Sequence, residues 1–584
     1  MVGKTLIATA LEETWPKHPT VPVLFLGEWC RIYSRKHRWS KLNQEIIPYH
    51  WDDRKKLKED YIFLSKIYEK LLRELANELN KVHKTSHSLR YWRIIVGPWL
   101  GYFTQIVFDR WFMISYAVAN YNISNIFCIK KNFSKNIPEN MEHFISLLAT
   151  DQWNEKIFRE ILQTLKIPFQ DVKEKKTTLK NNPQAKKTLF LTCVKKILNK
   201  LSGCIAQTQK YFFVKSYIPF LYRIKIQILL KQIPTIWEIP IIKLPKRNDS
   251  FKRKLIPLVK HNQNNFFEVI KCLLWSNIPR SYLEDFKAIY DIADKFTWPR
   301  NPKAIFTSNS WLDDDFFKIW AAKKIDQGTQ LIIGQHGGSY GVAKFNFGED
   351  HQIAISDKFI TWGWLHPKQS KVIPVGNFKD HKKKTNWKRN GRALMVLCSI
   401  PRYSYWLYSV PVSAGQWNSY FEDQCRFIQA LPDQIRRNLL IRVHPQDYGH
   451  HQMLRWKERF PAITLDDGNS SISNILKSTR LYISTYNATT YLESLRLNMP
   501  TIIFWNPIHW ELRESALPYF KKLEDVGIFH KTPESAAEKM TSIWDNVKKW
   551  WEQKKVQSVR QEFCECFSKE SQLIPNKIAE TLSN

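Results

Sequence analysis

Short apolar runs alternate with amphipathic segments along this 584-residue chain, which predicts an α/β protein with buried parallel strands. Lys4–Ala10 predicts a first strand, and the acidic residues Glu12 and Glu13 follow its carboxyl end. Val21–Gly27 predicts a second strand, which is followed by Glu28. A general base for an acceptor hydroxyl would lie on such a strand-end loop, so Glu12 and Glu28 are candidate catalytic residues. The alternative is that Glu12 and Glu13 only cap the helix that comes next.

Residues from about 54 to 290 have mostly helical spacing, and we interpret them as a large insertion into the first α/β domain. Tyr91–Tyr121 is so apolar and aromatic that we expect a buried or interfacial helix, while an arginine and a Gly-Pro pair argue against a membrane span. Asp171–Lys187 is polar and lysine-rich, which predicts an exposed loop. Ala206–Ile233 predicts a basic, aromatic helix that, with the basic segment Leu244–Lys254, could dock on anionic lipid headgroups.

Strand-like runs resume near residue 302 and complete the first domain. The predicted strands are Ala304–Thr307, Gln330–Gly334, Ile353–Trp362 and Val372–Val375. The second of these leads into Gln335-His336-Gly337-Gly338, where two glycines after a histidine allow the backbone to approach a ligand closely. His336 could deprotonate an acceptor hydroxyl, since an ordinary imidazole suits that role. The alternatives are that His336 donates a hydrogen bond to a donor phosphate or only stabilises the turn.

The composition of residues 379–391 marks a boundary between two domains. This segment is charged and ends near a glycine, so we interpret it as a basic linker between an acceptor-side domain, residues 1–378, and a nucleotide-donor domain, residues 392–584. Ala393–Cys398 predicts the first strand of the second domain. The chain from Ser535 onward is helical and is expected to fold back across the hinge.

A strand end in the second domain has the pattern Arg-x-His-Pro. The apolar run that begins at Leu439 stops there, because Pro445 cannot continue a strand. Arg442 and His444 are two positions apart and therefore lie on one strand face. His444 could bond a departing phosphate. Arg442 could pair with the same phosphate or with a carboxylate such as Asp466.

A β-α-β unit between Leu481 and Trp505 supplies a second candidate element. Its connecting turn is rich in short polar side chains, namely Ser484, Thr485, Asn487 and Thr489. Such side chains and the free N–H groups of a helix N-terminus form an anion site, most often for phosphate. Glu493, on the helix that follows, would accept hydrogen bonds from ribose hydroxyls; otherwise it is an ordinary surface carboxylate.

These elements resemble the donor half of a GT-B-type transferase. Bacterial sialyltransferases, capsule Kdo transferases and CDP-glycerol glycerophosphotransferases have similar His-Pro and serine-rich elements. Nearly the whole chain is also similar to a family of transferases from O-antigen and surface-polysaccharide gene clusters. The stretches that carry this second likeness are KTLIATALEETW, FLGEWC, YHWDDR and GQHGGSYG.

The resemblance implies a GT-B-like fold, in which two Rossmann-like domains face each other and the first contains the helical insertion. It implies a transferase that moves a sugar or polyol-phosphate group from a nucleotide-activated donor, of CMP or CDP type, to a polysaccharide or lipid-linked acceptor. In the glycerophosphotransferases a similar His-Gly pair supplies the catalytic base, which supports that role for His336. No permanently bound cofactor and no metal ligands are expected. The first alternative is a non-catalytic scaffold of a polysaccharide assembly complex. The second is a nucleic-acid-binding protein, which would account for the basic charge.

Charge and composition narrow the partners and the location. The net charge of +35 favours anionic partners such as nucleic acid, acidic lipid surfaces or phosphorylated substrates, although lysines spread over helices also make an ordinary solvated surface. No nucleic-acid-binding signature accompanies the charge, so we expect no nucleic acid partner. Nine scattered cysteines argue against a disulfide framework or a zinc site. We expect a cytoplasmic protein, peripheral at the inner face of the membrane.

Overall fold

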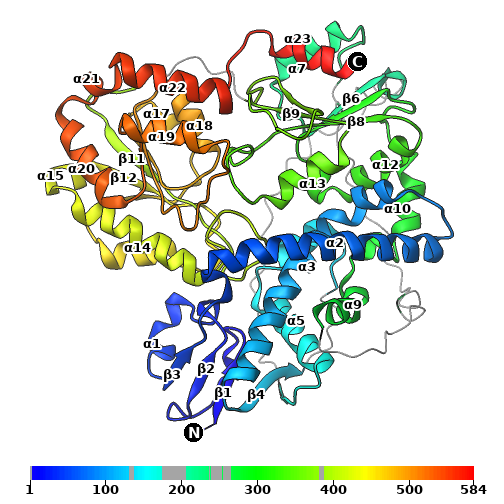
Figure 1. Ribbon diagram of the computed structural model, residues 1–584, viewed down its shortest axis with the longest axis vertical. Helices are drawn as coiled ribbons and strands as arrows, with labels where there is room; N and C mark the ends of the chain where they lie inside the picture. Colours follow the sequence, from blue (N-terminus) through cyan, green and yellow to red (C-terminus); the bar gives the residue numbers. More distant parts are fainter. Residues whose placement is uncertain are drawn as a thin grey trace, which may run out of the picture.

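The computed structural model describes residues 3–130, 137–173, 205–235, 237, 253, 265–379 and 387–584. Within these residues the strands form three parallel sheets, so the α/β class predicted from the sequence is confirmed. Figure 1 shows the first sheet at the bottom, the second at the upper right and the third at the upper left. Two long helices, α2 (Arg54–His83) and α3 (Leu89–Asn120), cross the middle of the molecule.

The first sheet has the strand order β3-β2-β1-β4-β5, which is a Rossmann-like order. Apolar residues of its central strands are buried, and the α2–α3 hairpin is inserted between β3 and β4. The strands are β1 (Lys4–Ile7), β2 (Val23–Phe25), β3 (Gln44–Ile46), β4 (Ile123–Lys130) and β5 (Gln170–Lys173).

The second sheet has the order β10-β9-β8-β7-β6, so its strands are neighbours in the order in which they follow along the chain. That order differs from a Rossmann fold, in which the chain returns past its first strand. The strands are β6 (Tyr211–Val214), β7 (Ala304–Thr307), β8 (Gln330–Gly334), β9 (Lys358–Thr361) and β10 (Val372–Pro374).

The third sheet has the order β13-β12-β11-β14-β15-β16, the six-stranded Rossmann order. The chain reverses direction across the sheet between β11 and β14, and ligands of open α/β sheets bind at such a switch point. Helix α14 (Ala414–Ala430) is the first helix after β11, and α18 (Thr489–Arg496) is the first after β14. The strands are β11 (Arg392–Val396), β12 (Leu439–Arg442), β13 (Thr464–Asp466), β14 (Thr479–Ser484), β15 (Thr501–Phe504) and β16 (Phe529–His530).

Helix α3 is buried, which is one of the two alternatives that its apolar sequence left open. It contacts α2, α5 (Asp151–Thr164), α12 (Asp315–Asp326) and α13 (Phe347–Ile355), so it joins the first sheet to the second. Its buried Arg110 bonds Asp109 and donates to the side-chain amide oxygen of Asn154 at 2.9 and 3.1 Å, which compensates the buried charge. Among the described helices, none is long and apolar enough to cross a membrane.

Three sequence predictions differ from the structure. The insertion predicted at residues 54–290 is not only helical, because it contains β4, β5 and β6. Ala206–Ile233 is not one helix: it comprises β6 and α7 (Phe220–Leu229), and a four-residue apolar run cannot be assigned by periodicity alone. The first residues of the predicted strand Ile353–Trp362 end α13, which Asn346 caps by accepting from the Glu349 amide at 3.1 Å.

Several predicted segments lie largely outside the described residues. These are the loop Asp171–Lys187 beyond β5, the basic segment Leu244–Lys254 except Arg253, and most of the linker at 379–391.

The C-terminal helix α23 (Ile574–Ser583) folds back onto the second sheet, as expected. It packs against α7, and the Thr581 carbonyl accepts a hydrogen bond from the Lys358 ammonium at 2.8 Å. The Asn377 amide donates to the Lys569 carbonyl at 2.8 Å. The end of the chain therefore holds the second and third sheets together, and Figure 1 shows α23 beside α7 at the top.

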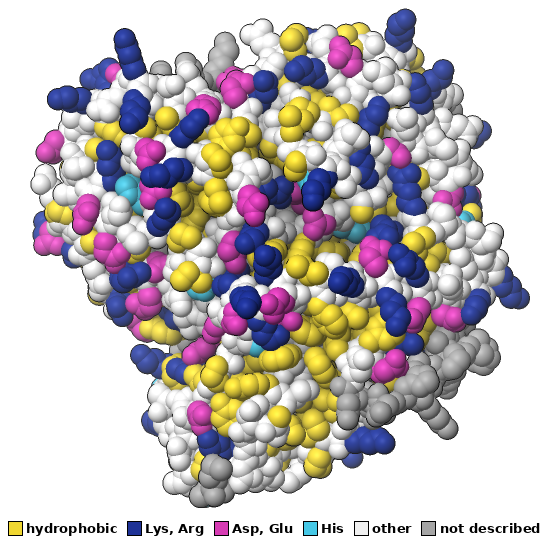
Figure 2. All heavy atoms as spheres, viewed as in Figure 1, with side chains coloured by type: hydrophobic (Ala, Val, Ile, Leu, Met, Phe, Trp, Pro, Cys, Tyr) yellow, Lys and Arg dark blue, Asp and Glu magenta, His cyan; other side chains and the backbone are white. Residues whose placement is uncertain are grey.

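Basic side chains are spread over the face shown in Figure 2, with acidic side chains between them, and they form no continuous stripe there. On this face the distribution is that of an ordinary solvated surface.

Candidate active site

The glycine turn after β8 touches the start of α18, so the second and third sheets meet at their carboxyl edges. A β-carbon on Gly338 would lie 2.3 Å from the Ala488 carbonyl oxygen and 2.7 Å from Thr489 Cα. The buried Gln335 holds the turn: its amide nitrogen donates to the Gly337 carbonyl at 2.7 Å, and its amide oxygen accepts from the Trp362 backbone at 2.9 Å. The sequence predicted that this turn approaches a ligand closely. In the structure the turn lies against the backbone at the start of α18.

His336 lies half-buried in an aromatic setting beside this turn. Its ring centroid is 5.2 Å from that of Tyr340, 6.2 Å from that of Tyr217 and 6.5 Å from that of Trp311. The Tyr340 hydroxyl is 3.4 Å from the ring nitrogens. Burial, followed by the charge of Lys379, lowers the pKa of His336 from 6.5 to about 4. The imidazole is therefore neutral at neutral pH and can accept a proton.

Lys379 lies five residues after the end of β10 and forms an ion pair between the second and third sheets. Its ammonium lies 3.5 Å from a Glu493 carboxylate oxygen on α18 and 5.9 Å from the centre of the Tyr217 ring. His336 and Glu493 were predicted on opposite domains, and Lys379 places them at one junction. The sequence did not indicate that Lys379 lies between His336 and Glu493, because it placed this residue in the linker.

Most polar side chains of the hydroxyl-rich turn after β14 form hydrogen bonds within the protein. Ser484 donates to the Tyr486 carbonyl at 3.3 Å, and Thr485 donates to the Val396 carbonyl at 2.9 Å. The Asn487 amide oxygen accepts from a tyrosine hydroxyl at 3.2 Å, whereas its amide nitrogen is buried without a hydrogen-bond partner. Helix α18 begins at Thr489 with no side-chain cap. The Asn487 amide nitrogen and the first amides of α18 are therefore the groups here that can bind an anion.

A second junction joins the first sheet to the third and contains a cleft of about 350 Å³. Glu28, Tyr49 and Asp52, which follow β2 and β3, line one side of it. Ser413 and Gly415 line the other side at the N-terminus of α14, where Ser413 forms no side-chain cap and its buried hydroxyl has no partner. The carboxyl edges of these two Rossmann-ordered sheets thus face each other, which is the GT-B-like pairing predicted from the sequence.

The two junctions are adjacent. The Tyr420 hydroxyl, on α14, is 2.6 Å from the Thr485 hydroxyl and accepts from the Cys398 amide at 2.9 Å. Ser419, the residue before Tyr420, lines the 350 Å³ cleft. A ligand at the switch point of the third sheet would therefore lie between the N-terminus of α14 and that of α18.

Arg442 and His444 occupy the other side of the third sheet, because β11 separates β12 from β14. The Arg442 guanidinium is engaged by the Asp466 carboxylate and by the Gly468 and Ser470 carbonyls, the latter two at 2.6 Å. This is the carboxylate alternative that the sequence left open. His444 accepts a hydrogen bond from the Gln446 amide at 3.1 Å. Two strand spacings, roughly 10 Å, separate β12 from β14.

The two acidic candidates of the first sheet lie in different settings. The Glu12 carboxylate pairs with Arg38 and lies 3.8 Å from Arg35, and Glu12 does not line the cleft. Glu28 does line it, with Arg31 at 3.4 Å. The structure therefore brings Glu28, but not Glu12, to the third sheet.

Sequence reasoning missed two groups of residues at these junctions. Arg402 donates to the Trp29 carbonyl and pairs with Asp151 at 2.8 Å, which fixes the first sheet against the third. Ser413 and Gly415 begin a helix after the first strand of a Rossmann-ordered sheet. Small residues in that place are typical of a phosphate-binding turn, and this signal was present in the sequence.

Strand order and converging sheet edges define the class: an α/β protein of parallel sheets that meet at the carboxyl ends of their strands. The family model described as the LIC12162 family transferase matches residues 4–582, and the chain belongs to that transferase family. No curated protein is similar enough to count as a match.

Three solved structures show a distant likeness. The first is MurG of Acinetobacter baumannii, with 11% identity, a TM-score of 0.31, and coverage of 54% of this chain and 86% of MurG. A variant of the wall teichoic acid polymerase TagF has 11% identity, a TM-score of 0.28, and coverage of 53% and 76%. WaaG, a glycosyltransferase involved in lipopolysaccharide biosynthesis, has 10% identity, a TM-score of 0.27, and coverage of 52% and 96%. The fold described above rests on the chain's own sheets.

Proposed function

We propose that this transferase moves a sugar or polyol-phosphate group from a nucleotide-activated donor to a surface-polysaccharide intermediate. The observation that carries the proposal is the switch point of the third sheet, where α14 and α18 both begin without a side-chain cap. The donor phosphates lie between these two helix N-termini. The Ala414 amide of α14 donates to the Arg402 carbonyl at 3.0 Å, so the anion would be held by the amides that follow it, by the first amides of α18 and by the positive ends of the helix dipoles.

The chemistry needs stabilisation of the charge that develops on the departing nucleotide phosphate. The first amides of α18 and the buried Asn487 amide nitrogen supply donors, and Lys379 supplies a positive charge at the same junction. Donors that are fixed before the reaction stabilise such charge without reorganisation. Glu493, which lies 3.5 Å from Lys379, is close enough to this junction to accept from the donor ribose, as proposed from the sequence.

We assign the general base to His336. The imidazole is neutral at neutral pH because burial lowers its pKa to about 4, and it flanks the turn that contacts Ala488 and Thr489. It takes the proton of the acceptor hydroxyl as that oxygen bonds to the transferred group. Glu28 faces the adjacent cleft and is assigned to acceptor binding. Glu12 receives no catalytic role, since its carboxylate is paired with two arginines outside the cleft.

The second sheet offers a surface for the membrane on which a lipid-linked acceptor would lie. On and around α7, large apolar side chains are exposed: Tyr217 44%, Phe220 51%, Leu221 75%, Ile228 60%, Leu229 41% and Ile233 60%. Lys215, Lys225 and Lys231 are exposed among them. Apolar residues interleaved with lysines favour an anionic bilayer surface. Because Tyr217 is next to His336, this surface would bring a membrane-bound acceptor near the proposed base.

A nucleotide titration with one charge variant tests the donor site. Thr489→Asp adds a carboxylate at the first position of α18, which suits the helix dipole but repels a phosphate. Two unit charges about 4 Å apart interact by about 4 kcal/mol near a protein surface, so nucleotide affinity should fall at least about tenfold while the melting temperature is kept. The ligands to be tested are CMP, CDP, UDP, GDP and their sugar conjugates. Their binding is measured by thermal shift and by calorimetry.

Gln553→Asp is the matched control, because it adds the same charge at the exposed N-terminus of α22 (Lys554–Phe567). It should leave nucleotide affinity unchanged. Equal affinity in Thr489→Asp and in the unmodified protein would move the phosphate site away from α18.

A further inference from the structure

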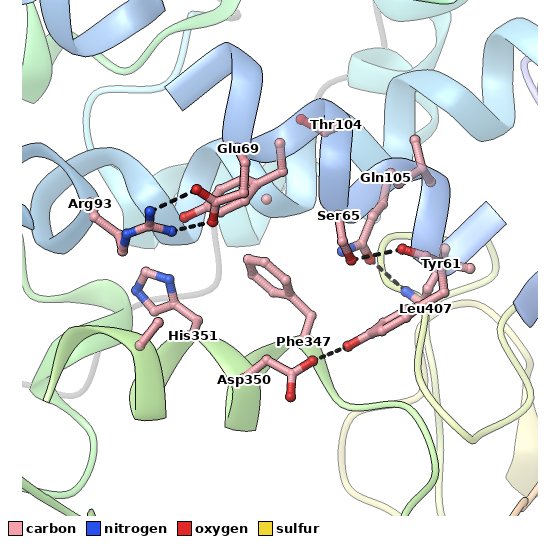
Figure 3. A pocket seen from close by; sticks show the side chains of 14 residues that line it. Tyr61, Ser65, Glu69, Arg93, Thr104, Gln105, Phe347, Asp350, His351 and Leu407 are labelled. Carbon is pink, nitrogen blue, oxygen red and sulfur yellow. Dashed lines mark hydrogen bonds and ion pairs between the residues drawn. The ribbon is translucent and has the colours of Figure 1, made fainter. Parts of the chain in front are cut away.

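A cavity of about 190 Å³ lies between α2, α3 and α13, apart from the junctions of the proposed donor site. Figure 3 shows Phe347 from α13 inside it, with Glu69 above, Arg93 at the upper left, Asp350 below and Tyr61 extending from the right toward Asp350. The Arg93 guanidinium binds the Glu69 carboxylate through two hydrogen bonds, at 2.5 and 2.8 Å. Tyr61 donates its hydroxyl hydrogen to Asp350. Elements of the α2–α3 hairpin and of the second sheet thus build the walls together.

Two buried groups in the lining, the Tyr68 hydroxyl and the His351 imidazole, lack a protein hydrogen-bond partner. The His351 side chain is 3% exposed, and both ring nitrogens are buried without a hydrogen bond. Helix α3 leaves room for the ring at Gly97, where a β-carbon would lie 2.6 Å from His351 Cε1. A neutral imidazole offers one N–H donor and one acceptor nitrogen, so it matches hydroxyl groups, which also donate and accept. Leaving such a group unpaired is costly, which favours a polar ligand.

The charges around the cavity disfavour an anion. Among the described residues that line it, Arg93 is the only cation, and Glu69 already neutralises it. Asp350 adds a further acidic group. A phosphate or carboxylate would find no unpaired cation here, whereas a neutral polyhydroxylated ligand would find carboxylate oxygens, an imidazole and the Gln105 side chain.

Shape and apolar surface limit the size of the ligand. An engineered apolar cavity of roughly 150 Å³ in another protein accommodates benzene, so a cavity slightly larger than that holds one six-membered ring. Tyr61, Tyr68 and Phe347 contribute aromatic surface to the lining. Aromatic surface packs against the C–H face of a pyranose, while polar groups at its rim bond the hydroxyls. Few convergent polar groups on an apolar wall are typical of small-ligand sites.

We propose that this cavity binds one neutral sugar ring. Given the proposed function, the ring belongs to the acceptor glycan. The Trp311 ring supports this connection, because its centroid is 6.5 Å from that of His336 and 5.6 Å from that of His351. The buried Gln352, next to His351, donates to the Tyr340 hydroxyl at 2.5 Å, and that hydroxyl contacts His336. A sugar in the cavity would therefore be separated from the proposed base, His336, by the Trp311 ring.

Saturation-transfer NMR on the full chain tests the proposal without any transfer reaction. The probes are methyl glycosides of neutral hexoses, N-acetylhexosamines and 6-deoxyhexoses, with glucuronate and N-acetylneuraminate as anionic probes. Ser65→Trp should block the cavity from an exposed lining position on α2, and His351→Phe should remove the hydrogen bonds while keeping a ring. Lys66→Trp is the matched control, since it places the same side chain at the next exposed α2 residue, outside the lining.

We expect at least one neutral glycoside to give a signal that falls to background in Ser65→Trp and His351→Phe and persists in Lys66→Trp. The proposal is overturned if no neutral glycoside gives a signal, if the anionic probes bind better, or if the signal survives both cavity variants. Nucleotide affinity, measured on the same samples, should be unchanged in all three variants. Glycoside binding with this pattern, without any nucleotide binding, would support the cavity and contradict the donor proposal, so the two failures are distinguishable.

Discussion

Gly337 and Gly338 are neighbours in one turn, but a β-carbon would meet different surroundings at each. At Gly337 the nearest atom is Tyr340 Cε2 at 3.1 Å, whereas at Gly338 it is backbone of α18 at 2.3 Å. Backbone cannot move aside as a side chain does, so the contact between the second and third sheets depends on the missing side chain of Gly338.

We predict that Gly338→Ala destabilises the protein by about 1–3 kcal/mol, the usual cost of an overpacked contact. Gly337→Ala should cost less than about 1 kcal/mol, because the Tyr340 ring can shift by a few tenths of an ångström. Chemical denaturation of both variants gives the comparison. Equal costs would mean that the turn does not press on α18.

His336 makes a prediction about pH. Burial and the charge of Lys379 lower its pKa to about 4, so it stays unprotonated, and able to accept a proton, until the pH falls to about 4. The acid limb of kcat/KM should therefore lie near pH 4 and not near 6.5. Lys379→Met should move that limb to higher pH, because the repelling charge is gone. A limb that stays in place in Lys379→Met and in His336→Ala would belong to another group.

At this scale the sequence indicates residue type better than residue partner. His336, Gly338 and the Ser484–Thr489 turn stand at strand ends, which is visible in the pattern of apolar runs. The partner of Arg442 and the position of Lys379 depend on which strands become neighbours, and a single sequence does not contain that information. The sequence therefore left two possible partners for the Arg442 guanidinium, a phosphate and the Asp466 carboxylate.

Among the elements, α5 connects to the first sheet through one buried carboxyl group. Glu155 accepts from the Thr9 hydroxyl at 3.0 Å and from the Ile129 amide at 3.0 Å, at the carboxyl ends of β1 and β4. Burial raises the pKa of Glu155 from 4.5 to about 7. Folding thus favours the protonated form, so the contribution of this group to stability is complete below pH 4.5 and is lost as the pH rises through 7.

We predict that the melting temperature of the unmodified protein falls between pH 5 and 8 relative to that of Glu155→Gln. Each pKa unit corresponds to about 1.4 kcal/mol, so the difference between the two proteins should change by at most about 3 kcal/mol. Glu142→Gln, an exposed change on α4 (Met141–Leu147), is the control and should follow the unmodified protein. A constant difference across this pH range would show that Glu155 does not titrate in it.

Long or strongly patterned elements were predictable, and short ones were not. The apolar runs of β7 and β8 match the predicted strands residue for residue, and α3 matches to within two residues at each end. The Tyr211–Val214 strand was absorbed into a predicted helix, since four apolar residues fit either period. The start of α13 was missed because its signal is a capping asparagine and not a periodic stripe.

For the whole molecule, the sequence predicted two domains, and the described residues form three sheets whose carboxyl edges converge on the third. The facing Rossmann-ordered pair was predictable from alternating strands and helices. The separation of the first and second sheets was not predictable, because β4 and β5 lie beyond two long helices. The pairing of β4 with β1 is a long-range contact, and β5 joins the sheet only through β4.

The exposed apolar surface around α7 makes a prediction for the whole molecule. The protein should co-sediment with vesicles that contain anionic lipid and dissociate as salt is added, because salt screens exposed charges within about 10 Å at 0.1 M. Replacing Leu221 and Ile228 together by glutamate should abolish binding. Ile62→Glu, an exposed apolar position on α2, should have no effect. If vesicle binding is unchanged by salt and by the double variant, the surface around α7 is not the membrane-binding surface.

The central claim is that a nucleotide donor binds at the carboxyl edge of the third sheet, between α14 and α18. Hydrogen exchange of the full chain, with and without the nucleotide that binds best in the titration, tests this claim directly. We expect slower exchange at residues 397–416 and 484–490, with a smaller effect at 335–340 where the glycine turn meets α18. Protection confined to the first sheet, or to β12 and the loop after Arg442, would contradict it.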